Sequence, residues 1–375
     1  MKQIVILGSA YPLRGGLAAF NERLALEFVR EGHEVVIYTF SLQYPSFLFP
    51  GKTQYSGDPA PPHLNIKVKV NSINPFNWLK VGNELRKLKP DLLIIKFWLP
   101  FMAPCFGTIA RLTVMNKKTR VISILDNVIP HEKRLFDKAL ISYFVGACNG
   151  FVAMSKQVLN DLLLFTKVKP AVIIPHPVYD NFGDKVSRKE ACEQLHLDEQ
   201  FQYILFFGFI RQYKGLDLLL EAMANEKLQG KKIKLIIAGE FYDDAKFYHA
   251  LIEKHQISEQ LVLATDFIAD NEVKYYFSAA DLVVQPYRTA TQSGISQIAY
   301  HFEKPMVVTN VGGLPEIVHD GKTGFVVNTE PHEIAAAIVK FFEGNYMQEM
   351  LPQVKEEKKK FQWQTMTSGI LKLMQ

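Results

Sequence analysis

Short apolar runs alternate with helical patterns along almost the whole chain, and this alternation limits the fold more than any other feature. The runs are KQIVILG, HEVVIYTF, PDLLIIKF, TRVISIL and NGFVAMS in the first half, then YILFFGFI, IKLIIAGEF, LVLATDFI, DLVVQPY, PMVVTN and GFVV. Such alternation predicts parallel strands joined by crossover helices. We therefore expect an α/β protein built from doubly wound parallel sheets.

The length of 375 residues and a break in the pattern predict two domains. Strand periodicity stops across residues 172–191, where proline, asparagine, glycine and charged residues enter, as is typical of a hinge. We expect Rossmann-like domains at 1–178 and 179–358. Ligands of such sheets lie beyond the carboxyl ends of the strands, so the predicted site is a cleft where the two domains face each other.

Residues 359–375 are expected to form a last helix. Its apolar residues recur at helical spacing: Trp363, Met366, Ile370 and Leu373. A lone terminal helix needs a partner surface. It packs either on its own domain or back on the first one, and the sequence leaves both alternatives open.

The cysteine content and the distribution of apolar residues predict the cellular compartment of the protein. The three cysteines lie far apart and match no metal-ligand spacing, which predicts a reducing compartment and inert core thiols: Cys105, Cys148 and Cys192. The chain enters a strand at once, so we expect no signal peptide and a cytoplasmic location. The most apolar stretch, 97–115, contains two prolines and Arg111, which predicts a strand end, a loop and a packed helix rather than a membrane span.

A glycine pair, Gly15 and Gly16, lies between a predicted strand at Ile4–Leu7 and a predicted helix that Gly32 ends. A dinucleotide site is not expected, because G-x-G-x-x-G is absent and the second strand ends without an acid. A P-loop is not expected either, because G-x-x-x-x-G-K-[ST] is absent. Two interpretations stay open: a simple turn, or an anion that the opposite domain presents to the N–H groups at the helix start.

The segment GFIRQYKGLDLLLEAM, residues 208–223, supplies cations that would suit such an anion. Arg211 and Lys214 lie three residues apart in a loop that opens a helix, and Gly215 allows close backbone approach. An arginine fork and a lysine point charge form a good receptor for a diphosphate. The alternative is two solvated surface cations.

Residues 285–327, QPYRTATQSGISQIAYHFEKPMVVTNVGGLPEIVHDGKTGFVV, resemble the donor-binding region of the retaining, metal-independent glycosyltransferases of GT-B architecture (family 4). The stretches GSAYPLRGGLAAFNERLA, DNVIPHE and GFIRQYKGLDLLLEA match the same family in order. The resemblance covers essentially the whole chain and implies two Rossmann-like domains. The combination of motifs is specific, although each motif alone is not.

The resemblance implies roles for particular residues. The backbone of Gly15 and Gly16 would bind the donor diphosphate, and Arg211 and Lys214 would bind its oxygens as negative charge gathers on the leaving group. The implied donor-binding set is Gly15, Gly16, Gly208, Arg211, Lys214, Gln292, Ser293, Gly294, Ile295 and Glu316. The implied catalytic set is Arg211, Lys214, Asp126, Asn127 and His131. The last three of these would orient the sugar rather than react.

The chain also departs from the family pattern. Where most members carry E-x7-E, this chain has Thr291 and Ala299, or Ala290 and Ile298 when the alignment shifts by one residue. Ribose recognition must then come from elsewhere. Glu303 and Glu316 are nearby, but the sequence does not place either.

One feature agrees with the family pattern and one further position departs from it. No D-x-D is present, the carboxylate spacing used elsewhere to hold a nucleotide-bound cation, and this fits the metal-independent reaction that the resemblance implies. Asp126 stands where the family often has a histidine, at the end of a first-domain strand.

The expected function is transfer of a sugar from a nucleotide-diphosphate sugar to a glycan, glycolipid or small-molecule acceptor, with retention and without a metal or bound cofactor. Cell-surface polysaccharide, lipopolysaccharide or glycolipid biosynthesis would use such a step. The alternatives are a non-catalytic sugar-nucleotide binder and a sugar-nucleotide epimerase of similar architecture. The nucleotide base would contact the loop near Pro175 and His176, or the loop after IIAGE.

The charge of the chain bears on two kinds of partner, a membrane surface and nucleic acid. The net charge of +5 is mild and permits an anionic membrane surface without demonstrating one. The basic helix Leu79–Lys89 and the apolar FWLPFMAP could together touch an anionic bilayer at the inner membrane face. The alternative is a solvated face over a packed core segment. No nucleic-acid partner is expected.

Overall fold

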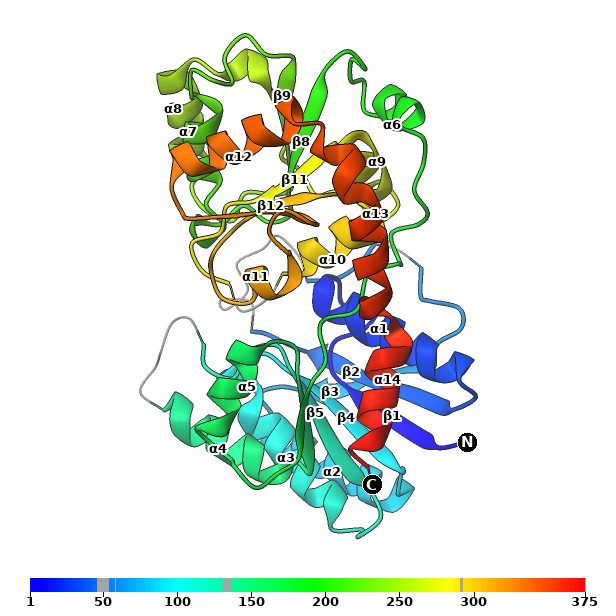
Figure 1. Cartoon of the computed structure of the whole chain (residues 1–375). Coiled ribbons are helices and arrows are strands. Elements are labelled where there is room, and N and C mark those ends of the chain that lie inside the picture. Colours follow the sequence, from blue (N-terminus) through cyan, green and yellow to red (C-terminus); the bar gives the residue numbers. More distant parts are fainter. Residues whose placement is uncertain (46–53, 58, 131–135, 291–292, 375) are drawn as a thin grey trace. The chain divides into compact units, whose positions relative to one another are not determined.

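The computed structural model describes residues 1–375 apart from 46–53, 58, 131–135, 291–292 and 375. The chain forms two compact units, drawn in Figure 1. Unit 1 comprises Met1–Pro175 and Trp363–Gln375, and unit 2 comprises His176–Gln362. The expected domain boundaries lay at 178 and 358, a few residues from the points where these units divide.

Unit 1 contains a seven-stranded parallel sheet with the strand order β3-β2-β1-β4-β5-β6-β7. Its strands are β1 Gln3–Leu7, β2 Glu34–Leu42, β3 Ile66–Asn71, β4 Leu92–Phe97, β5 Arg120–Leu125, β6 Gly150–Ala153 and β7 Ala171–Ile173. The chain adds strands first on one side of β1 and then on the other. This order confirms the predicted doubly wound α/β class.

Helices cover the sheet of unit 1 (Figure 1). They are α1 Gly16–Arg30, α2 Pro75–Leu88, α3 Ala103–Val114, α4 Asp137–Ala147, α5 Lys156–Leu163 and α14 Trp363–Lys372. The apolar stretch 97–115 forms the end of β4, a short 3-10 helix and α3, with Met102 and Phe106 fully buried. This confirms the interpretation of that stretch as part of the core. Among the helices of the described residues, none is long and apolar enough to cross a membrane.

Two strands of unit 1 were missed by the sequence analysis. β3 is an edge strand of sequence IKVKVN, which alternates apolar and polar residues but contains no continuous apolar run. β7 has only three residues and lies at the start of the segment expected to be a hinge. Edge strands need little apolar sequence because only one side pairs. Hydrophobic runs therefore identify central strands better than the borders of a sheet.

Unit 2 repeats the architecture with a six-stranded parallel sheet in the order β10-β9-β8-β11-β12-β13. Its strands are β8 Gln202–Phe207, β9 Ile233–Ala238, β10 Leu261–Ala264, β11 Leu282–Gln285, β12 Met306–Thr309 and β13 Gly324–Val327. All six lie in the runs expected from the sequence. The strand order again extends on both sides of the first strand, which confirms a second doubly wound sheet.

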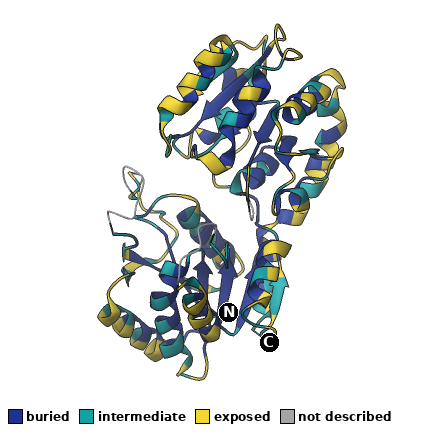
Figure 2. Cartoon of the chain, turned by 90° about the vertical axis from the view of Figure 1, so that its left-hand side faces the viewer, coloured by how far each residue is buried: buried dark blue, intermediate teal, exposed yellow. Residues whose placement is uncertain are grey.

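The helices of unit 2 are α6 Arg188–Gln194, α7 Leu216–Met223, α8 Ala245–His255, α9 Val273–Ala279, α10 Gly294–His301, α11 Leu314–Ile317, α12 Pro331–Glu343 and α13 Tyr346–Lys358. In both units the sheet strands are largely buried, while the outer faces of the helices are exposed (Figure 2). Each unit thus has its own core, as two separate hydrophobic clusters show.

The last helix, α14, packs on unit 1, which resolves the alternatives left by the sequence. The Trp363 ring is buried, with its centroid 5.1 Å from that of Phe20 in α1 and 5.1 Å from the Arg23 guanidinium carbon. The Gln364 amide donates to Glu27 of α1, and the Thr367 hydroxyl donates to Glu31, the residue that follows this helix. Figure 1 shows α14 beside α1. Unit 1 is therefore completed by residues from both ends of the sequence.

The three cysteines are free and buried in the cores. Burial raises the pKa of the Cys148 thiol to about 12 and raises that of Cys105 further. Thiols of this kind are poor nucleophiles at neutral pH. Their surroundings agree with inert core cysteines.

Candidate functional site

The glycine pair forms the start of α1. Gly15 has φ 103°, a conformation that favours glycine, and α1 begins at Gly16. The Gly15 carbonyl accepts from the amides of Ala18 and Ala19 at 3.0 and 3.1 Å. A Cβ added to Gly15 would meet no atom within 4 Å, so there is open space beside the loop. A ligand could approach this helix start, whose dipole favours an anion.

The loop before the glycine pair is fixed by hydrogen bonds. The Asn21 amide donates to the Ser9 carbonyl at 2.9 Å, and the Thr39 hydroxyl donates to the Ala10 carbonyl at 3.0 Å. The Tyr11 amide donates to the Glu22 carboxylate at 2.6 Å. The β1–α1 loop is therefore held from its own helix and from β2.

Asp126 follows β5 directly, and its environment contains a residue that the sequence analysis missed. The Lys96 ammonium lies 2.7 Å from Asp126 Oδ1, and the Lys96 side chain is 2% exposed. Burial lowers the pKa of Lys96, while the neighbouring Asp126 charge opposes this shift. The signal available in the sequence was a lysine inside the apolar run PDLLIIKF. Asn127 comes next in the loop, and His131 lies outside the described residues.

In unit 2, Lys214 is a buried cation. Its side chain lies at the end of a 3-10 helix after β8 and is 8% exposed. Among the described residues, its ammonium has no hydrogen-bond or ion-pair partner. Burial and the Arg211 charge lower its pKa to about 8. A buried lysine without an acid is unfavourable in isolation, so the geometry is that of a receptor for an anion.

Arg211 lies three residues earlier on an aromatic support. Its guanidinium carbon is 5.1 Å from the Tyr242 ring centroid, and the Tyr242 ring stacks on Phe209 at 4.3 Å. Stacking against an aromatic face orients a guanidinium without neutralising its charge. Arg211 and Lys214 thus form a cationic pair beyond the carboxyl end of β8.

The structure brings three predicted donor-site residues together in unit 2. A Cβ on Gly208, which has φ 95°, would lie 2.9 Å from Lys214 Nζ and 3.3 Å from Ile295 Cδ1. Glycine is therefore needed at 208 both for its backbone angle and for the close approach of Lys214. Ser293 and Gly294 precede Ile295 at the start of α10, and Gln292 lies outside the described residues.

Tyr287 is a second residue that the sequence analysis missed. It is 4% exposed, its ring centroid lies 5.7 Å from Lys214 Nζ, and its hydroxyl is 3.4 Å from Ser293 Oγ. The sequence assigned Tyr287 to the end of a strand, but β11 ends at Gln285. Tyr287 therefore links the lysine loop to the loop before α10.

Close contacts hold these two loops together. A Cβ on Gly215 would lie 2.0 Å from the Pro286 carbonyl oxygen, and the Arg288 amide donates to the Tyr213 carbonyl at 2.7 Å. The Arg288 side chain also pairs with Asp217 in the first turn of α7. The cationic pair therefore stands on a rigid support within unit 2.

Of the four positions that could correspond to the missing carboxylates, the three that the structure describes are apolar and buried. Ala290 is 7% exposed, Ile298 4% and Ala299 fully buried, and Thr291 lies outside the described residues. Glu303 forms a turn after α10 and is surrounded by three lysines at 3.6–3.9 Å: Lys185, Lys355 and Lys358. Its carboxylate thus belongs to a surface ion network.

Glu316, the other nearby carboxylate, lies in α11, a single turn that follows Gly312 and Gly313. The described residues contain no group of His, Cys, Asp and Glu side chains that could hold a metal ion.

His176, one candidate for contact with a nucleotide base, is occupied within its own loop. It is 4% exposed, with Nδ1 2.7 Å from the Pro177 carbonyl oxygen and Nε2 3.1 Å from the Tyr179 hydroxyl. The other candidate, the loop after IIAGE, carries Tyr242 beside Arg211.

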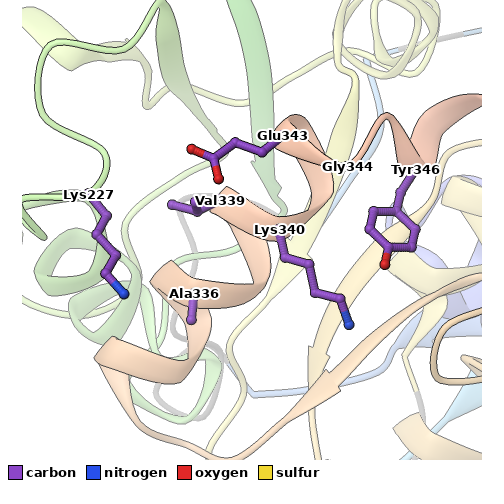
Figure 3. A pocket seen from close by; sticks show the side chains of 7 residues that line it. All are labelled: Lys227, Ala336, Val339, Lys340, Glu343, Gly344 and Tyr346. Atoms are coloured by element: carbon purple, nitrogen blue, oxygen red, sulfur yellow. The ribbon is translucent and has the colours of Figure 1, made fainter.

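A surface hollow elsewhere in unit 2 does not involve the predicted residues. Figure 3 shows the hollow and the side chains that line it: Lys227, Ala336, Val339, Lys340, Glu343, Gly344 and Tyr346. The Lys340 ammonium lies 4.4 Å from the Phe325 ring centroid, and Glu343 pairs with Lys231 at 2.8 Å. Lys340 and Glu343 thus already have contacts within unit 2.

Comparison with solved structures identifies the fold. Anabaena HepE in complex with UDP superposes with a TM-score of 0.75 at 16% identity, over 99% of this chain and 98% of that one. Its complex with UDP-glucose gives a TM-score of 0.69 over the same shares, also at 16% identity. The chain therefore has the GT-B fold of these glycosyltransferases, as expected from the sequence.

The sequence comparison identifies the family. Residues 14–182 match the model described as Glycosyltransferase Family 4, and residues 187–361 match Glycosyl transferases group 1. The chain belongs to this family of glycosyltransferases.

Two curated relatives match over shorter segments. A protein in the cps region of Klebsiella pneumoniae is 26% identical over 39% of this chain and 38% of its own length. Lipopolysaccharide 1,2-N-acetylglucosaminetransferase of Salmonella typhimurium is 27% identical over 36% of each. The chain thus spans less than half the length of either relative.

Proposed function

We propose that this protein transfers a sugar from a nucleotide-diphosphate sugar to a glycan, glycolipid or small-molecule acceptor, with retention of anomeric configuration. The observation that carries the proposal is Lys214, which is buried beside Arg211 without an anionic partner among the described residues. A diphosphate would supply the missing negative charge. Membership of the glycosyltransferase family and the UDP complexes of HepE support a nucleotide-linked donor.

In this mechanism the donor diphosphate is the leaving group. Arg211 and Lys214 bind its oxygens, and both contacts strengthen as the sugar–phosphate bond breaks and negative charge gathers there. Gly208, Ser293, Gly294 and Ile295 are proposed to contact the donor within the same unit, with Gln292 and Glu316 as further proposed donor contacts. We propose that the cations supply this stabilisation without a metal ion or bound cofactor.

Unit 1 contributes the start of α1 and the loop after β5. The backbone of Gly15 and Gly16 is proposed to bind the same diphosphate, because a helix start with open space beside it suits an anion. Asp126, Asn127 and His131 are proposed to orient the sugar or the acceptor. Retention is proposed to follow front-face attack, in which the departing phosphate accepts the proton of the acceptor hydroxyl.

The first experiment is a thermal-shift screen of the intact protein against nucleotides and nucleotide sugars, followed by release of free nucleotide from each donor that binds. Release that depends on an added acceptor supports transfer. Binding without release in any acceptor panel would instead indicate a non-catalytic binder. An epimerised sugar nucleotide that forms without acceptor would indicate an epimerase.

The acceptor side includes a surface suited to an anionic bilayer, although not the one expected. No residue of FWLPFMAP is exposed, and Phe97, Pro100, Met102 and Ala103 are buried, so this segment offers little surface to a bilayer. Ile73 and two residues of α2, Phe76 and Leu79, are instead 47%, 83% and 46% exposed, and Lys80 and Lys87 are exposed on the same helix. We propose that this face touches the inner membrane surface, where a lipid-linked glycan would be the acceptor.

Sedimentation with vesicles of anionic and of zwitterionic lipid tests the membrane contact. Binding to anionic vesicles alone, lost in Phe76→Ser, is the expected result. Equal binding of that variant and the wild type would rule out this face. An effect on soluble-acceptor transfer is not expected, because Phe76 lies outside the proposed site.

A further inference from the structure

A buried lysine in the central sheet of unit 1 has no role in the donor chemistry proposed above. Lys96 is the last residue but one of β4, a strand whose six residues are all buried. β4 pairs with β1 on one side and with β5 on the other. Removing an ammonium from water is costly, so a lysine here requires compensating contacts.

Lys96 makes two such contacts, and each belongs to a different part of the proposed site. Its ammonium lies 2.7 Å from Asp126 Oδ1 and 3.5 Å from the centroid of the Phe20 ring. Asp126 follows β5, and Phe20 lies in the second turn of α1, the helix that begins at Gly16. Lys96 therefore connects the glycine helix with the loop after β5.

The position of Asp126 is fixed by its backbone as well. The Asp126 amide donates to the Phe97 carbonyl at 2.9 Å, which extends the β4–β5 pairing by one step. Its side chain is 14% exposed. A carboxylate is thus held at the carboxyl ends of the central strands, where ligands of parallel α/β sheets bind.

We propose that Lys96 is a positioning residue of the transfer reaction, which holds the Asp126 carboxylate in place for the substrate. The inference rests on the proposed function and deepens it. Lys96 touches no substrate itself, because it lies beneath Phe20 and is 2% exposed. Its effect on catalysis therefore passes through Asp126.

The experiment is a double-mutant cycle on the full chain. Lys96→Met removes the ammonium at similar volume, Asp126→Asn removes the carboxylate charge, and a third variant carries both changes. Misplacing an orienting group lowers kcat by up to about 10²-fold, so both single variants are expected to lose turnover on this order. Because Lys96 acts through Asp126, the double variant is expected to match Asp126→Asn within about twofold.

Two further variants separate positioning from stability. Lys96→Gln keeps a hydrogen-bond donor for Asp126 and is expected to regain part of the kcat lost in Lys96→Met. Lys304→Met is a matched control, because Lys304 is a buried lysine of unit 2 that donates to the Ser278 carbonyl at 3.3 Å. It is expected to keep the wild-type kcat.

Thermal stability gives the remaining readout. The double variant has no unpaired buried charge, so its Tm is expected to lie above that of Lys96→Met while kcat stays low. Recovery of kcat together with Tm would show a purely structural ion pair and overturn the proposal. Unchanged turnover in Lys96→Met, or independent losses that multiply, would overturn it as well. If the wild type transfers no sugar from any donor, the proposed function fails and this inference fails with it.

Discussion

Lys214 is unfavourable for the free protein, and the proposed function gives it a role. A buried ammonium without an acid loses its hydration and gains little in return. The Tyr287 ring orients Lys214 and the Tyr242 ring orients Arg211, but no acid among the described residues pairs with either cation. A diphosphate would supply the negative charge that the site lacks. Its attraction to the two cations would strengthen as its charge grows during bond cleavage.

Substitution of Lys214 tests this at the residue itself. Lys214→Ala is expected to lower kcat by roughly 10²-fold or more, because one charge-assisted contact to the leaving group is lost. Steady-state kinetics with the donor identified in the screen measures the effect, with Lys304→Met as the control for loss of a buried lysine. Wild-type turnover in Lys214→Ala would mean that the diphosphate binds elsewhere.

The pKa of Lys214 gives a pH prediction. Burial and Arg211 lower this pKa to about 8, so the fraction of free enzyme with a charged lysine falls as the pH rises through that value. Donor kcat/KM is therefore expected to fall on the alkaline side near pH 8, rather than near the usual lysine pKa of about 10.4. Burial also lowers the pKa of Lys304 to about 8. The fall should persist in Lys304→Met, and its absence from the wild type would contradict the assignment.

Among single residues, the sequence predicted the charged loop residues of the site but not the residues that contact them. Arg211 and Lys214 stand out because a helix opens directly after them. Lys96 and Tyr287 do not, because a single polar group in an apolar run has many ordinary interpretations. Lys96 matters because it contacts Asp126, and Tyr287 matters because it contacts Lys214. Such contacts between residues far apart in the sequence depend on the order of the strands in each sheet.

Among the elements, the loop from β8 to α7 and the loop from β11 to α10 behave as one structure. Gly215 allows them to touch, since a side chain there would collide with the Pro286 carbonyl. Without that approach, Tyr287 could not reach the lysine loop. Rigid supports of this kind keep charged groups at fixed distances from a ligand.

Gly215→Ala is expected to weaken donor binding and to lower Tm more than a positive φ alone explains. Gly230→Ala is the matched control, because Gly230 also has a positive φ, 71° against 66°, and has open space around its Cβ position. Both variants pay the backbone cost of a left-handed alanine, about 1 kcal/mol. Equal losses of Tm and donor affinity would show that the contact with Pro286 is unimportant.

The elements themselves were largely predictable, and the exceptions have physical causes. Central strands such as β4 and β9 are nearly continuous apolar runs because both faces are covered. β3 alternates lysine with apolar residues at a sheet edge, and β7 is too short to show any period. The start of α1 was predicted from the glycine pair, although only the structure gives the open space beside Gly15.

For the whole molecule, the proposal requires that residues of both units bind one diphosphate. Gly15→Ala and Lys214→Ala lie in different units, and distant substitutions usually have additive effects within about 0.5 kcal/mol. Through a shared ligand they are expected to be non-additive for UDP affinity. Isothermal titration of the wild type, both single variants and the double variant measures the coupling. Strictly additive effects on UDP affinity would show that the two loops do not bind the same diphosphate.

The return of α14 to unit 1 gives a second prediction at this scale. Trp363→Ala is expected to destabilise unit 1 by about 3–5 kcal/mol, because a large buried ring is removed from the surface of α1. Hydrogen exchange should then accelerate in α1 but not in α7. Lys372→Ala, at an exposed position of the same helix, serves as the control. Unchanged exchange in α1 would show that α14 contributes little.

Because α14 covers α1, the order of synthesis matters for this chain. The ribosome makes Phe20 and Arg23 early, but the indole that shields them comes more than 300 residues later. Domains usually fold as they emerge, the first before the second. In this chain, unit 1 keeps the apolar surface of α1 uncovered while unit 2 is translated. During that interval, a chaperone or a chain on a neighbouring ribosome can bind to this exposed surface.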